Sequence, residues 1–335
     1  MRKIKITKQL KKDVEDFNIN LFSTRDSRFE LPNKRLEKLR KRLKGNSKLK
    51  RHYEYVDEII KCYPEILNAD PPKMRALIKK FNKILLPSIV ASTYPNNQKR
   101  YFYKDVVYAL RYEALRGKEF PIYLKSTNIK TCVYCNSQNT LVIEKIYSDK
   151  KKRRVIDTQA KLELDHFHSK SKYPFLATSF FNLYPTCGNC NKAKSDKDAL
   201  FELYTYSDEL DIFRFKIDDK SILDYWINLD REELKIDLKP VFYADKKTLK
   251  NHNDLFQVQA IYDKQKDFGE ELVWKAKVNP KIYKETMYKM FKSLFPDKTY
   301  IDRAIIGNYV KPEETFKRPM AKYTQDLARQ LKLIK

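Results

Sequence analysis

The sequence of 335 residues is poor in glycine, cysteine and tryptophan, with five, five and two of them. It has no apolar run near the ~18 residues of a membrane-spanning helix, and no apolar signal segment follows the basic residues at its start. It also lacks GxxxxGK[ST] and GxGxxG loops and any internal repeat. We therefore expect a cytoplasmic chain that does not associate with membranes.

Composition predicts a folded, mainly helical chain. Hydrophobic residues make up 42% and aromatic residues 13%, which argues against global disorder. Charged residues at 34%, with so few glycines, indicate long helices with charged surfaces. We expect an α+β fold in three parts: a basic helical region over 1–125, a small β-containing domain over 126–205, and a mainly helical region over 206–335.

The formal net charge is +26, and most of it is N-terminal. Residues 1–130 hold 32 Lys and Arg against 14 Asp and Glu. Such an excess favours a polyanionic partner, because each neutralised phosphate releases condensed counterions. Charge alone leaves nucleic-acid binding open, since lysine-rich composition has other origins. The run from Lys34 to Leu43 fits either an arm on nucleic acid or an amphipathic helix with inward leucines.

Several local patterns predict secondary structure. Asp70-Pro71-Pro72 is typical of a helix start, and apolar residues recur at helical spacing until Pro87. A β-rich stretch from Leu141 to Tyr147, a basic turn and a second apolar stretch predict a hairpin, whose turn is a weak candidate for phosphate contact. Further helices are expected over 103–115, ended by Gly117, and over 249–266, 282–294 and 320–331. Core packing is expected for the stripe Met287, Met290, Phe291 and Leu294.

Four of the five cysteines form two CxxC pairs, Cys132 with Cys135 and Cys187 with Cys190. In a reducing compartment, such pairs are more often thiolate metal ligands than disulfides. The two-residue spacer lets both sulfurs of a pair reach one ion, and four thiolates leave no open coordination position. We expect one structural Zn²⁺. Redox chemistry and unpaired buried thiols are the alternatives.

Between and after these pairs lie residues suited to phosphodiester hydrolysis, which needs a base, a nucleophilic water and a cation. His166 has the pKa nearest neutrality and suits a general base. Asp165 and Asn191 offer oxygen atoms that suit Mg²⁺. Neighbouring strand residues point to opposite faces, so Asp165 and His166 can share one site only if the strand ends there. Asn182 is expected to fasten the following loop or orient the base.

These residues resemble the HNH nuclease family, in its zinc-stapled branch. The resemblance covers about residues 130–200 and is carried by Leu164-Asp165-His166-Phe167, Ser171-Lys172-Tyr173-Pro174, Asn182-Leu183-Tyr184-Pro185-Thr186-Cys187 and Cys190-Asn191-Lys192-Ala193-Lys194. It implies a ββα-metal core stapled by the four cysteines. It also implies an endonuclease that hydrolyses DNA, and similar proteins act beside an ATPase in Septu-type bacterial antiphage systems.

The resemblance implies one catalytic Mg²⁺ or Mn²⁺ held by Asp165 and Asn191, with His166 as the base and Asn182 positioning the base or its loop. The sequence has asparagine at position 191 where many members have histidine, and it adds a second imidazole at His168, the competing candidate for the base. The expected partners are nucleic acid, with DNA favoured over RNA, and an ATPase or another regulatory protein. The nucleic-acid contacts are expected from Lys170, Lys172 and Lys194. A zinc-stapled nucleic-acid-binding protein without catalysis is the alternative.

Overall fold

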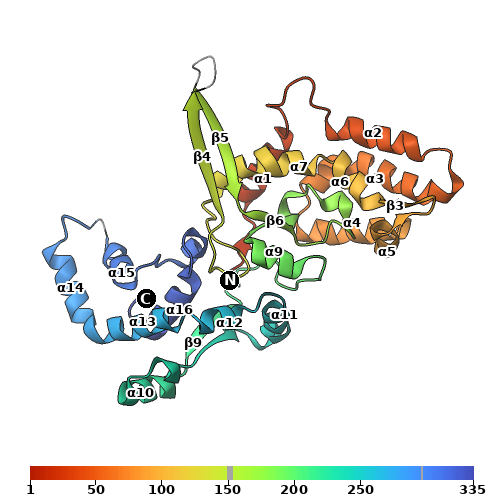
Figure 1. Ribbon diagram of the computed structural model, residues 1–335. Helices are drawn as coiled ribbons and strands as arrows, with labels where there is room; N and C mark the ends of the chain where they lie inside the picture. Colours follow the sequence, from red (N-terminus) through yellow and green to blue (C-terminus); the bar gives the residue numbers. More distant parts are fainter. Residues whose placement is uncertain (149–153, 296) are drawn as a thin grey trace.

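The computed structural model describes residues 1–148, 154–295 and 297–335. Most of these residues are helical, and the strands among them pair into five two-stranded sheets rather than one continuous sheet. The chain is therefore of mixed α and β class with helices dominating, as its composition predicts (Figure 1). Within the described ranges, no helix is both long and apolar enough to cross a membrane.

Helices dominate residues 1–127. Helix α4 (Pro71–Ile84) begins as predicted, because the Asp70 side chain accepts a hydrogen bond from the backbone N–H of Lys73 at 3.1 Å. The basic run lies in α2 (Pro32–Leu43), whose leucines are buried, so this segment is a packed amphipathic helix. The other elements up to residue 109 are β1 (Ile4–Lys5), α1 (Lys8–Ile19), α3 (Lys50–Leu67), α5 (Pro87–Ala91), β2 (Thr93–Tyr94), β3 (Asn97–Tyr101) and α6 (Phe102–Ala109).

The helix predicted over 103–115 is interrupted. Helix α6 ends at Ala109, and Arg111 adopts a left-handed backbone conformation with φ of 63° before the short helix α7 (Tyr112–Ala114). This conformation costs a non-glycine residue about 1–2 kcal/mol. Gly117 does not end a helix, since it lies inside a π-helical turn (Leu115–Glu119) that continues into α8 (Phe120–Thr127). The chain thus turns sharply at Arg111.

The predicted hairpin is confirmed. Strands β4 (Leu141–Ser148) and β5 (Arg154–Lys161) pair in antiparallel register along their whole length and project from the body of the molecule (Figure 1). Most of the basic turn, residues 149–153, lies outside the described residues, so its phosphate contact stays a prediction. Strand β6 (Glu163–His166) pairs with β7 (Leu183–Thr186), and α9 (Gly188–Lys194) follows and packs against β6.

Residues 204–335 form a second, mainly helical part. Its elements are β8 (Tyr204–Thr205), β9 (Phe213–Ile217), α10 (Asp219–Asn228), β10 (Ile236–Pro240), α11 (Lys246–Phe256), α12 (Val258–Asp263), α13 (Lys266–Val278), α14 (Lys281–Met290), α15 (Thr299–Ile306) and α16 (Ala321–Gln330). The expectation of a core stripe from Met287 to Leu294 is wrong, because α14 ends at Met290 and because Met290 and Leu294 are each 70% exposed. Helical spacing predicted a buried face that the structure does not form.

Both ends of the chain pack against the middle. Strand β1 pairs in parallel with β8, with Ile4 opposite Tyr204. The backbone N–H of Met320, just before α16, donates to the carbonyl of Asn136 at 2.7 Å. Buried apolar residues from all three parts of the sequence form one hydrophobic cluster. Residues 130–200 are therefore held between the N-terminal helices and the C-terminal helices.

Candidate metal centre and active site

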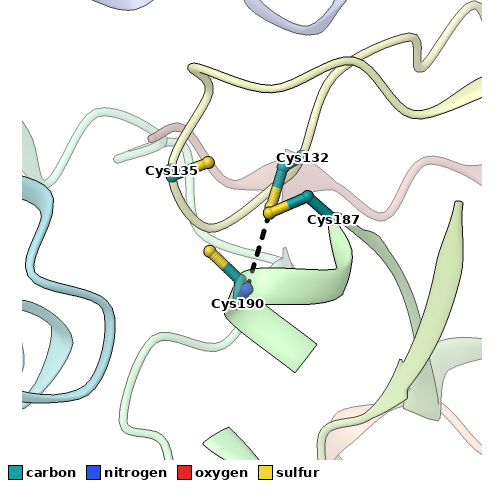
Figure 2. A group of neighbouring side chains, drawn as sticks. All are labelled: Cys132, Cys135, Cys187 and Cys190. Carbon is teal, nitrogen blue, oxygen red and sulfur yellow. Dashed lines mark hydrogen bonds between the residues drawn. The ribbon is translucent and has the colours of Figure 1, made fainter. Parts of the chain in front are cut away.

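The two CxxC pairs lie together, as predicted. The sulfur atoms of Cys132, Cys135, Cys187 and Cys190 are all within 4.8 Å of one another, and every one of these residues is buried (Figure 2). Hydrogen bonding with Cys132 lowers the pKa of Cys135 and of Cys187, whereas burial raises the pKa of Cys132 and hydrogen bonding with Cys132 raises that of Cys190. Four buried sulfurs at this spacing could hold a zinc ion in a closed tetrahedral site, which suits a structural role.

The first CxxC turn is clamped by the C-terminal helices. His252 of α11 and Tyr262 of α12 both bind it through hydrogen bonds to backbone carbonyls, at 2.8 Å to Tyr134 and at 2.9 Å to Cys135. The Tyr134 ring also stacks on Phe256, with ring centroids 4.2 Å apart. No local pattern predicts these contacts. They connect the first CxxC turn to residues more than 110 positions away.

Asp165 lies at the centre of a buried polar group. Its side chain accepts a hydrogen bond from the Tyr134 hydroxyl at 2.7 Å and pairs with the Lys194 ammonium at 3.2 Å. Burial raises the pKa of this carboxyl, and the charge of Lys194 opposes the rise. Tyr134 stands inside the CxxC turn, so the cysteine cluster places a hydrogen-bond donor on the candidate metal ligand.

The position of Lys194 corrects its predicted role. We expected this lysine to meet a phosphate oxygen, but its side chain is 0% exposed. Its ammonium also donates to the carbonyl of His166 at 2.6 Å. Lys194 therefore ties α9 to the end of β6 and is not available on the surface to nucleic acid.

His166 is the last residue of β6, and the strand ends directly after it. Both Asp165 and His166 are still paired with β7, so whether their side chains serve one site stays a prediction. Its Nε2 lies 3.1 Å from the carbonyl of Ala177. A carbonyl can only accept, so Nε2 carries the proton and Nδ1 keeps its lone pair. Burial, followed by the nearby charge of Lys170, lowers the pKa of His166 to about 3. The imidazole is consequently neutral at physiological pH, with Nδ1 able to accept a proton.

Asn182 fastens the loop after His166, one of the two roles expected for it. Its side-chain oxygen accepts from the backbone N–H of His168 at 2.7 Å, and its amide donates to the carbonyls of His168 and Leu176, both at 3.1 Å. Asn182 is completely buried. The amide closes this loop and so holds the segment that carries Ala177, the residue that orients His166.

His168 is less well placed than His166 to act as a base. Its Nε2 is buried without a hydrogen-bond partner among the described residues, and burial lowers its pKa to about 4. Its ring packs edge-on against Phe167 and Tyr173. No described carbonyl or carboxylate fixes its tautomer, so His168 lacks the orienting contact that His166 has.

Asn191 lies on α9, one turn before Lys194, and is partly exposed. Residues three apart share a helix face, which puts Asn191 on the face that carries Lys194 towards Asp165. Lys170 and Lys172, the two other predicted nucleic-acid contacts, have different partners. Lys172 pairs with Asp198 at 3.3 Å, whereas the Lys170 ammonium lies over the Tyr112 ring, 4.9 Å from its centroid.

Tyr112 also contacts the candidate base, although no sequence motif indicates it. Its ring centroid is 4.6 Å from that of His166, and its hydroxyl donates to the carbonyl of Leu164 at 3.3 Å. Tyr112 comes from α7, far from the central motifs in sequence. It follows the helix break at Arg111, and no local pattern signals that break.

Comparison of the chain with protein-family models, with curated proteins and with solved structures found no match. Any function proposed for the chain therefore follows from the chemistry of the residues in this site.

Proposed function

We propose that the chain is a metal-dependent endonuclease of the HNH type that hydrolyses phosphodiester bonds of DNA. The observation that carries the proposal is the neutral His166, whose Nε2 proton is held by Ala177 and whose Nδ1 is left to accept a proton. Asp165 precedes it on β6, and Asn191 lies on α9, which packs against β6; both side chains carry oxygen donors. A base beside hard oxygen ligands is the donor set that hydrolysis of a phosphodiester needs.

Each of these side chains has one role in the proposed mechanism. His166 takes a proton from water at Nδ1, and the carbonyl of Ala177 stabilises the imidazolium that forms, because it accepts from Nε2. Asn182 keeps the loop in place during this step. Asp165 and Asn191 would hold Mg²⁺ or Mn²⁺, which supplies positive charge for the phosphate and the departing oxygen.

The Asp165 carboxylate keeps lone pairs that such an ion could use. Two hydrogen-bond donors, Tyr134 and Lys194, occupy it, and an ionised carboxylate offers about four lone-pair sites. The donor set of two oxygens fits a hard cation, whereas the four sulfurs nearby fit zinc. The two metal roles thus fall on two chemically distinct sets of residues.

One observation favours a second candidate, a nucleic-acid-binding protein without catalysis. The Lys194 ammonium already neutralises Asp165 within the protein. A buried cation at 3.2 Å repels a second cation at the same carboxylate. If this pairing persists in solution, the site binds no magnesium. The protein would then bind nucleic acid through its basic N-terminal region without cleaving it.

Cleavage of plasmid DNA by the zinc-loaded chain separates the two candidates. We expect cutting with Mg²⁺ or Mn²⁺, none without a divalent ion, and a loss of at least a hundredfold for His166→Ala. His168→Asn is the matched control and should keep most of the activity. Absence of cutting under several metals would favour the binding protein, and equal cutting by His166→Ala and wild type would remove His166 as the base.

The proposed setting is bacterial defence beside an ATPase, and the resemblance to Septu-type effector subunits is its support. Isolation of the chain from its native source tests it. Copurification with an ATPase would agree with the proposal, whereas vigorous DNA degradation by the purified chain alone would count against a licensing partner.

A further inference from the structure

A solvent-accessible hollow lies beside the candidate active site. It has a volume of about 610 Å³, between the N-terminal helices and the loop that follows β6. Its lining includes Arg35 of α2, Tyr108 of α6, Arg111, Tyr112 of α7 and Lys170 of the loop, and it also includes one carboxylate, Glu113 of α7. The volume is within the range of about 300–1,000 Å³ that is typical of ligand sites. Tyr112 also contacts His166, so the hollow adjoins the proposed base.

The cations in this hollow are incompletely paired. Among the described residues, Arg111 has no carboxylate at ion-pair distance, and its Nε is buried without a hydrogen-bond partner. Its guanidinium lies over the Phe29 ring, 4.0 Å from the centroid. The Arg35 Nε lies 3.3 Å from the Glu30 carboxylate, but its Nη1 is buried without a hydrogen-bond partner. Burial, followed by the neighbouring charge of Arg35, lowers the pKa of Arg111. Two desolvated guanidinium groups that repel each other favour an anion between them.

Lys170 adds a third cation to the lining, from a different segment of the chain. Its ammonium contacts the Tyr112 ring and has no carboxylate partner among the described residues. Burial lowers its pKa as well. Because Lys170 belongs to the loop after His166 and the two arginines belong to the N-terminal helices, the hollow joins the basic region to the proposed nuclease core.

The hollow also offers an aromatic surface. Tyr108 is 69% exposed, and the Arg35 guanidinium covers its ring at 4.4 Å from the centroid. Exposed aromatic rings beside arginines are the usual platform on which unstacked bases bind, and each stacked base is worth about 1–3 kcal/mol. A base inside a duplex has both faces covered by its neighbours. This surface therefore suits a single strand.

We propose that the hollow lined by Arg35, Tyr108, Arg111 and Lys170 binds a nucleotide of the substrate strand next to the bond that is cut, with its phosphate on the arginines and its base on the tyrosine, and that the substrate is single-stranded. This inference rests on the proposed nuclease function. A free nucleotide carries the same phosphate and base, so the experiment compares the two sources.

The test is fluorescence anisotropy of the zinc-loaded full chain, without added magnesium, against a labelled single strand of about 12 nucleotides. We expect Arg111→Ala to weaken binding roughly tenfold or more, because a charge-assisted hydrogen bond is lost. Arg111→Lys should retain part of the affinity. Lys220→Ala, which removes an exposed cation on α10, is the control and should bind like wild type.

Tyr108→Ala is a second variant, chosen because its exposed side chain contributes little to folding. It should weaken binding of the single strand roughly fivefold or more and binding of a duplex of the same sequence much less. If Arg111→Ala and Tyr108→Ala, both folded by thermal melting, bind the single strand like Lys220→Ala, the inference is overturned. It is also overturned if thymidine 5′-monophosphate alone binds as tightly as the strand.

Failure of this inference differs from failure of the nuclease proposal. Binding is measured without turnover, so a strand that binds through Arg111 but is never cut would leave the subsite standing and remove the enzyme. A chain that cuts with Mg²⁺ equally well after Arg111→Ala and Tyr108→Ala would keep the enzyme and remove the subsite.

Discussion

Replacement of Lys194 by methionine tests the buried polar group most sharply. Methionine fills a similar volume, so the change removes charge while keeping most of the packing. Lys194→Met leaves Asp165, which is 3% exposed, with the Tyr134 hydroxyl as its remaining hydrogen-bond donor. Loss of one partner from a buried ion pair costs about 3–5 kcal/mol. Since Tyr134 still donates, we expect a destabilisation near 3 kcal/mol, within the range for buried pairs.

The assay is equilibrium urea unfolding at neutral pH in a zinc-containing buffer. The double variant, Lys194→Met with Asp165→Asn, should be destabilised by about 1–3 kcal/mol less than the sum of the two single variants, because it carries no unpaired buried charge. Lys192→Met, an exposed change on the same helix, is the matched control. If Lys194→Met and Lys192→Met unfold at the same urea concentration, Lys194 is not buried against Asp165 and the reasoning fails.

Three further predictions concern the framework of the site. Cys190→Ser should release zinc and lower the melting temperature, which metal analysis and calorimetry would detect, because a structural site contributes to folding free energy. His252 has its pKa lowered by burial to about 3, so its stabilisation is complete above the unfolded pKa near 6.5 and falls as pH decreases towards 3. His252→Gln should therefore flatten the pH dependence of unfolding between pH 6 and 4 by up to about 1.4 kcal/mol per pH unit, and equal slopes would contradict this. Asn182→Ala removes the hydrogen-bond partner of the His168 N–H and of the His168 carbonyl, so it should cost about 1–3 kcal/mol and reduce cleavage, while an unchanged melting temperature would count against its role in the loop.

The features that could be predicted from sequence are those set by nearby residues. The cysteine cluster follows from two CxxC spacers, the hairpin from alternating β-formers around a polar turn, and the start of α4 from Asp70 before two prolines. The end of β6 directly after His166 agrees with the turn that we expect there. Each of these depends on a few consecutive positions.

The features that were missed depend on distant contacts. Lys194 is buried because Asp165 and a carbonyl compensate its charge, and a lysine in a basic motif gives no sign of such partners. The helix break at Arg111 occurs at a residue that is not glycine, so the sequence does not predict it. The contact between Tyr112 and His166 therefore could not be predicted either. Met290 is exposed although its spacing is helical and apolar, because spacing specifies a face and not its environment.

Rescue of His166→Gly by added imidazole, measured in single-turnover DNA cleavage with Mg²⁺, tests the central claim most directly. We predict that the variant alone is at least a hundredfold slower than wild type, and that imidazole restores part of the rate by serving as the missing base. Cleavage by His166→Gly at the wild-type rate without imidazole would contradict the account.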